Sequence, residues 1–119
     1  MMQRTPLKRT RMRKAKPRRL AHGNPAYLEW IRSLPCVICS RGGRRQQSRT
    51  DAHHAGPRGL GQKVADEQAI PLCHHEHHVF GPESAHKLGR NFGPHHRLHI
   101  PRLIAWLQAE YSRRTDPCN

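Results

Sequence analysis

The stretch that decides the fold runs from Asp51 to His86 and reads DAHHAGPRGLGQKVADEQAIPLCHHEHHVFGPESAH. It opens with the pair His53 and His54 on a segment that favours a strand, passes through a glycine-rich turn, and returns along the apolar run AIPLC. A cluster of histidines follows this run directly. Imidazole and thiolate are the side chains that bind zinc and other transition metals. A strand, a turn, a second strand and a helix would bring both groups of histidines together, so we expect the chemistry here.

The composition indicates one small domain that needs a metal for stability. The chain has 119 residues, of which 34% are hydrophobic and 5% aromatic, which is little material for a self-sufficient core. We see no signal peptide and no apolar run long enough to cross a membrane, so we expect a cytoplasmic protein with reduced thiols. The pair Cys36-x-x-Cys39 then indicates metal ligands rather than a disulfide, and Cys73 at the end of the hairpin strengthens this interpretation.

The charge of the chain points to a polyanionic partner. The formal net charge is +14, and nucleic acid is the commonest polyanion in a cell. No amphipathic helix joins the basic residues to an apolar face, which argues against a membrane surface. Nine lysines and arginines and no acidic residue lie within the first 20 positions. We therefore expect a disordered basic arm over 1–22, a domain over 23–114 and a frayed tail over 115–119 that contains a free Cys118.

Two basic segments have alternative interpretations. The arm either binds DNA phosphates without sequence preference or is only a solubilising tail. The segment 40–50 is either a second phosphate-contacting patch or a solvated mobile loop. The residues that we expect to contact DNA are Arg41, Arg44, Arg45, Arg58, Lys63 and Arg90.

Helices are predicted on both sides of the hairpin. Asn24-Pro25 is a typical helix start, and an apolar stripe follows it at helical spacing: Tyr27, Leu28, Trp30, Ile31 and Leu34. A second helix is expected from near Glu83 towards Phe92, with a break at Pro94-His95-His96. The last helix is predicted over 101–113. After Cys73 the helical pattern is ambiguous, although residues four apart, such as His74 and His78, would share a face.

A hairpin followed by a helix, with a His-His pair on the first strand and histidines on the helix, resembles the ββα-metal, or HNH, nucleases. More narrowly, AHHAGPRGLGQKVADEQAIPLCHHEHH followed by GPESAHKLGRNF is similar to the phage and prophage nucleases related to the recombination-enhancement (Ref) protein. The similarity covers about residues 26–112 and includes a PC-x-x-C knuckle and a G-x-K-x-x-D turn, and the family also has a basic N-terminal arm. It implies an α+β fold: a small ββα-metal domain with a zinc knuckle and flanking helices.

The resemblance implies a structural zinc site. Cys36, Cys39 and Cys73 match the zinc ligands of the family. The family usually leaves two residues between the last cysteine and the His pair, whereas three separate Cys73 from His77 here. We favour His77 as the fourth ligand, and His74 or His75 could take its place.

The resemblance also implies a catalytic site that holds one divalent ion. His53 matches a ligand of this ion, and we expect His78 and His86 to complete the site. His54 matches the general base. Asp66 falls near the middle residue of the HNH signature, but it is not an asparagine, so it either orients the site by hydrogen bonds or only caps a turn. The ion could be Mg²⁺, Mn²⁺, Zn²⁺ or Ni²⁺, because imidazole favours transition metals while Mg²⁺ prefers oxygen.

These features predict a DNA endonuclease that hydrolyses phosphodiesters and leaves a 5′ phosphate. We expect a monomer. The resemblance implies a role in phage DNA recombination in a bacterial host cell, with a recombinase–DNA filament as a further partner. One alternative is a zinc-stabilised DNA-binding module that uses the same ligands without hydrolysis. Another is a protein that stores or senses metal.

Overall fold

The computed structural model describes residues 23–56 and 64–115. Three predicted features lie outside the described residues: the basic arm, the part of the turn that contains Arg58 and Lys63, and the tail from 116 to 119 with Cys118. The predictions for these segments therefore stay predictions. Within the described part of the chain, no helix combines the length and the apolar character needed to cross a bilayer.

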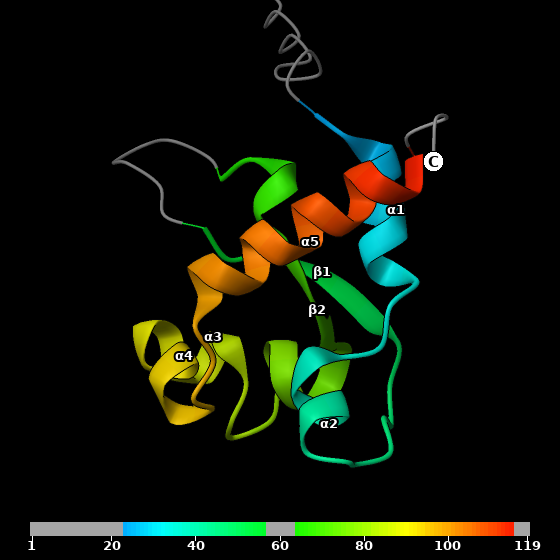
Figure 1. The fold of residues 1–119 in the computed structure, drawn as a ribbon. Helices are drawn as coiled ribbons and strands as arrows, with labels where there is room; N and C mark the ends of the chain where they lie inside the picture. Colours follow the sequence, from blue (N-terminus) through cyan, green and yellow to red (C-terminus); the bar gives the residue numbers. More distant parts are fainter. Residues whose placement is uncertain (1–22, 57–63, 116–119) are drawn as a thin grey trace, which may run out of the picture.

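An antiparallel hairpin forms the centre of the fold, as predicted (Figure 1). Strand β1 (Thr50–His54) pairs with β2 (Ala69–Cys73) in a regular register that sets Thr50 opposite Cys73 and His54 opposite Ala69. A 3₁₀ turn, η2 (Asp66–Gln68), leads into β2. All five residues of β2 are buried, whereas β1 becomes more exposed towards His54. The hairpin thus has its buried end at Cys73 and its exposed end at the histidine pair.

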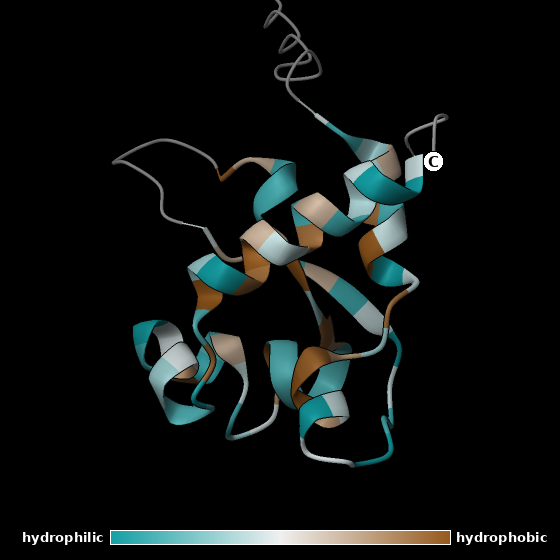
Figure 2. Cartoon of the chain, viewed as in Figure 1, coloured by the Kyte–Doolittle hydropathy of each residue, from teal (hydrophilic) through white to brown (hydrophobic). Residues whose placement is uncertain are grey.

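Two helices cover the hairpin and complete the core. Helix α1 (Pro25–Arg32) begins as predicted, because the Asn24 side chain accepts a hydrogen bond from the Tyr27 amide at 3.2 Å. Helix α5 (Ile100–Thr115) lies across the hairpin and, apart from its first residues, close to α1 in Figure 1. It extends two residues beyond the predicted end, so Thr115 belongs to this helix and not to the tail. The apolar positions of both helices turn towards the hairpin (Figure 2). Among the residues that the structure describes, the largest fully buried apolar side chains are Tyr27, Ile31, Ile70, Leu72 and Leu107.

A short helix that the sequence did not predict supports the cysteine knuckle. Helix α2 (Val37–Arg41) starts directly after Cys36, which occupies its N-cap position. The amide of Cys36 donates a hydrogen bond to Gln46 Oε1 at 2.8 Å, and Gln46 also donates to Thr50 Oγ1 at 2.8 Å. These bonds fix the knuckle against the start of β1.

The segment after β2 is a wide π-helical turn, η3 (His74–Val79). The amide of Phe80 donates to the carbonyl of His75 at 3.0 Å, five residues back, which is the hydrogen bond of a π-helix. Turns of this kind are rare and occur often at functional sites.

The predicted helix from Glu83 to Phe92 is instead three short elements, α3 (Ala85–Leu88), η4 (Gly89–Asn91) and α4 (Phe92–His95). The Ser84 side chain caps α3, so this helix starts later than predicted. Gly89 ends it with a φ of +57°, a left-handed conformation that favours glycine. The predicted break at Pro94-His95-His96 is wrong, because Pro94 and His95 lie within α4. A proline is tolerated in a first helical turn, where its missing N–H would have no partner inside the helix.

Candidate metal centres

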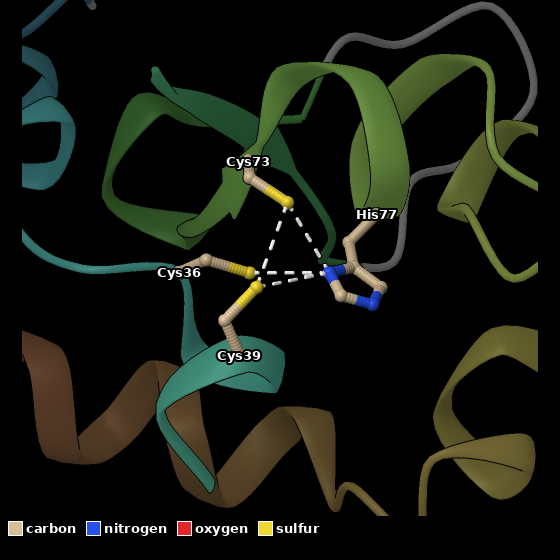
Figure 3. A group of neighbouring side chains, drawn as sticks. All are labelled: Cys36, Cys39, Cys73 and His77. Atoms are coloured by element: carbon tan, nitrogen blue, oxygen red, sulfur yellow. Dashed lines mark hydrogen bonds between the residues drawn. The ribbon is translucent and has the colours of Figure 1, made fainter. Parts of the chain in front are cut away.

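Three cysteines and one histidine converge between α2, the end of β2 and η3 (Figure 3). Cys36 and Cys39 come from the knuckle, Cys73 is the last residue of β2, and His77 projects from η3. All four side chains are buried. The predicted alternatives for the fourth position are excluded by their other contacts: His74 binds Asp51, and the exposed His75 packs on Phe80.

The distances within this cluster fit a tetrahedral metal. His77 Nδ1 lies 3.5, 3.6 and 3.2 Å from the sulfurs of Cys36, Cys39 and Cys73, and the sulfurs of Cys39 and Cys73 are 3.9 Å apart. Bonds of about 2.3 Å to sulfur and about 2.0 Å to nitrogen place zinc ligands about 3.5 Å (S to N) and about 3.8 Å (S to S) apart. Cys36, Cys39, Cys73 and His77 could therefore hold a metal such as zinc.

The electrostatics of the cluster favour a bound cation. Burial, followed by the neighbouring Cys36 and Cys73, raises the pKa of the Cys39 thiol to about 12. Burial also raises the pKa of Cys73. Three thiolates packed this closely repel one another, so the thiols stay protonated when no cation is bound. A bound divalent cation stabilises the deprotonated sulfur and thus lowers the pKa of each thiol. The donor set is the one that tetrahedral structural zinc prefers.

A second cluster contains His53 from β1, His78 from η3 and His86 from α3. One ring nitrogen of each lies within 4.8 Å of the others, so the structure brings the three predicted ligands together. His53 and His78 are partly buried and His86 is exposed, which leaves one side open to solvent. Burial, followed by the nearby His78, His86 and His54, lowers the pKa of His53 to about 4. His53 is thus neutral near pH 7 and can donate its lone pair to a metal.

Asp51 connects this cluster to the hairpin, although it was not among the predicted site residues. Its Oδ2 accepts hydrogen bonds from Nδ1 of His78 at 2.7 Å and from Nδ1 of His74 at 2.6 Å. Ligands that share a tetrahedral zinc would lie about 3.3 Å apart, so these shorter contacts are hydrogen bonds. Burial would raise the pKa of Asp51, but the bonds from His78 and His74 outweigh it and lower this pKa. Asp51 precedes His53 by two residues, and this spacing places both on one face of a strand.

The contact between Asp51 and His78 selects which nitrogen of the histidine is free. An ionised carboxylate only accepts hydrogen bonds, so Nδ1 of His78 carries the proton and Nε2 keeps its lone pair. A carboxylate behind a histidine is the usual way in which proteins orient metal-binding imidazoles. Nε2 is therefore the nitrogen of His78 that could bind a metal.

His54 is the last residue of β1 and pairs with Asp66. Its Nε2 lies 2.9 Å from Asp66 Oδ1, and Asp66 Oδ2 accepts a hydrogen bond from the Asn24 amide at 2.7 Å. The register of β1 against β2 is regular up to this residue, so the strand reaches His54 without a bulge. The side chain of His54 is 38% exposed. With Nε2–H donated to the carboxylate, the lone pair of a neutral ring lies on Nδ1.

The described arginines that are expected to contact DNA lie in different surroundings. Arg44 and Arg45 line a cavity with Cys39 and His77, beside the cysteine cluster. Arg41 is exposed and donates a hydrogen bond to the carbonyl of Arg97 at 3.1 Å. Arg90 lines a different cavity, of about 310 Å³, together with His53. Among these described arginines, Arg90 is the one placed beside the histidine cluster.

Comparison with known proteins yields one result. A family described as "Protein of unknown function (DUF968)" matches residues 8–109. The comparisons with curated proteins and with solved structures found no match. Because the family match covers most of the sequence, both candidate metal centres included, this chain belongs to the DUF968 family.

Proposed function

We propose that this protein is a metal-dependent DNA endonuclease of the HNH, or ββα-metal, type, similar to the Ref nucleases. The observation that carries the proposal is the convergence of His53, His78 and His86 from a strand, the turn after the second strand and a nearby helix. The cysteine cluster is separate from these histidines, so the two sites can serve different ions. Zinc in the cysteine site would stabilise the domain, and an ion in the histidine site would act on the substrate.

The roles of the side chains follow from their contacts. His53, His78 and His86 would hold a divalent ion that neutralises the scissile phosphate and stabilises the leaving 3′ oxygen. His54 accepts the proton of the attacking water at Nδ1, because its Nε2 already faces a carboxylate. Asp66 keeps the ring of His54 in this orientation and stabilises its protonated form. Hydrolysis in this direction leaves a 5′ phosphate on the product.

Charge supports DNA as the substrate. The chain carries a formal net charge of +14, and phosphate contacts with lysine and arginine supply most of the non-specific affinity for DNA. We extend the proposal to a monomer and to the setting that the resemblance implies: phage recombination in the bacterial cytoplasm, in contact with a recombinase filament.

Nicking of supercoiled plasmid in the presence of Mg²⁺, Mn²⁺, Zn²⁺ or Ni²⁺ tests the proposal. The wild-type protein should nick the plasmid, and His54→Ala should abolish nicking while zinc content and circular dichroism stay unchanged. His75→Ala is a matched control, because His75 is exposed and belongs to none of the described metal clusters. Plasmid binding without nicking in every metal would refute the nuclease and support the DNA-binding module. Weak DNA binding with variable metal content would support storage or sensing of metal.

A further inference from the structure

A cavity beside His53 has no role in the proposed reaction. It has a volume of about 310 Å³ and lies between the end of β1, the turn from α3 to α4 and the start of α5. Its walls are mainly apolar and include Ala55, Phe92 and Ile100. Mostly apolar pockets of this size with a few polar groups are typical of small-ligand sites in proteins.

Two polar side chains besides His53 line the same cavity. Arg90 is exposed and forms no ion pair with another described residue. The ring of His99 accepts a hydrogen bond at Nδ1 from the Arg102 amide at 3.2 Å. The proton of a neutral His99 ring is therefore on Nε2, which remains available as a donor. The cavity thus combines apolar walls with one cation and one hydrogen-bond donor.

We propose that this cavity binds an unstacked nucleobase of the DNA strand whose phosphate is held at the histidine site. The inference rests on the proposed function and deepens it by naming the substrate class. His53 lines the cavity and belongs to the histidine cluster, so the group that enters it belongs to a nucleotide next to that phosphate. Apolar walls suit the faces of a base, and the guanidinium of Arg90 can stack on the base or donate hydrogen bonds to its edge.

The bases of an intact duplex are paired and stacked inside the helix. A base must leave the stack before it enters a protein pocket, and the energy needed is smallest where the base is mismatched or already single-stranded. The preferred substrate is therefore DNA with an unpaired nucleotide beside the cut.

Binding and cleavage of matched DNAs test this inference. The probes are a perfect duplex and the same duplex with one central mismatch, so that length and charge are equal. Without added divalent ion, the wild-type protein should bind the mismatched probe about tenfold more tightly, since stacking of one base contributes about that factor. With divalent ion, nicking should occur next to the mismatch.

The variants separate the cavity from general effects of mutation. Ile100→Ala should lose most of the preference for the mismatch, whereas Leu103→Ala, on the same helix but outside the cavity, should keep it. If Ile100→Ala does not fold, Arg90→Gln changes an exposed residue of the cavity, and Arg102→Gln is its exposed control. Arg90→Gln should reduce the preference, and Arg102→Gln should not.

Equal affinity of the wild-type protein for both probes would overturn the inference, as would an unchanged preference in Ile100→Ala or Arg90→Gln. The proposed function fails independently: preference for the mismatch without any nicking would refute the nuclease and leave the base pocket in place. Nicking of both probes without any preference for the mismatch would refute the base pocket and leave the nuclease in place.

Discussion

Replacing Cys36 by serine tests the metal on which the core depends. A serine hydroxyl is a poor zinc ligand, so the variant keeps two thiols and His77 around a site built for four ligands. Thirteen hydrophobic residues are buried in the described part of the chain, and three of them are the cysteines of this cluster, so the described core has little apolar mass to compensate. Structural zinc sites contribute about 10–16 kcal/mol at neutral pH, whereas whole domains are stable by about 5–15 kcal/mol. We therefore expect Cys36→Ser to be unfolded at room temperature.

Metal content by mass spectrometry and thermal unfolding by circular dichroism measure this outcome. The wild-type chain should carry one tightly bound zinc and unfold cooperatively, and the variant should have lost this zinc and the transition. Removal of zinc from the wild-type protein with a strong chelator should reproduce the variant. Cys118→Ser is the matched control, because Cys118 is not one of the four proposed ligands. A Cys36→Ser protein that keeps its zinc and its melting temperature would show that the four side chains do not form a metal site.

A substitution addresses the histidine site, and a deletion addresses the arm. Asp51→Ala should weaken the binding of Mn²⁺ or Ni²⁺ to the zinc-loaded protein by about 10–100-fold in calorimetric titrations, because His78 loses the carboxylate that orients it. His74→Ala, which leaves that contact intact, should have a much smaller effect, and equal effects of the two would contradict the role of Asp51. Deletion of residues 1–20 should weaken DNA binding and reduce the slope of log affinity against log salt, because fewer counterions are released. An unchanged slope would mean that the arm is only a solubilising tail.

Local signals in the sequence predicted the hairpin and its neighbours. The β-leaning segment before the glycine-rich turn and the apolar run after it correspond to β1 and β2, and Asn24-Pro25 marks the start of α1 as expected. The grouping of Cys36, Cys39 and Cys73 was predictable because a Cys-x-x-Cys pair with a further cysteine at the end of a hairpin is typical of a zinc site. These predictions depend on residue type and short-range spacing, both of which a single sequence contains.

Features that depend on tertiary contacts were not predictable. The π-helical form of η3 satisfies contacts at two places: His77 faces the cysteines, while His74 and His78 both bond to Asp51. The spacing of four residues predicts that His74 and His78 share a face, but nothing in HHEHHV indicates the π-helical hydrogen bonding or the carboxylate that both histidines contact. The pairing of His54 with Asp66 was one of two options in the sequence, and only the return of the chain after the turn brings the two side chains together. Asp51 could have been found from its position two residues before His53.

Consecutive residues of one turn, His77 and His78, point to different clusters. The spacing between the cysteine cluster and the histidine cluster is thus set by a single peptide bond and by the five residues from Cys73 to His77. If one residue were added to or removed from this interval, His77 and His78 could no longer both reach their clusters. We expect this interval to be constant in length among functional members of the family, even where its amino-acid sequence varies. Zinc supply would then govern the second site as well, because a cell short of zinc would lose the turn that carries His78.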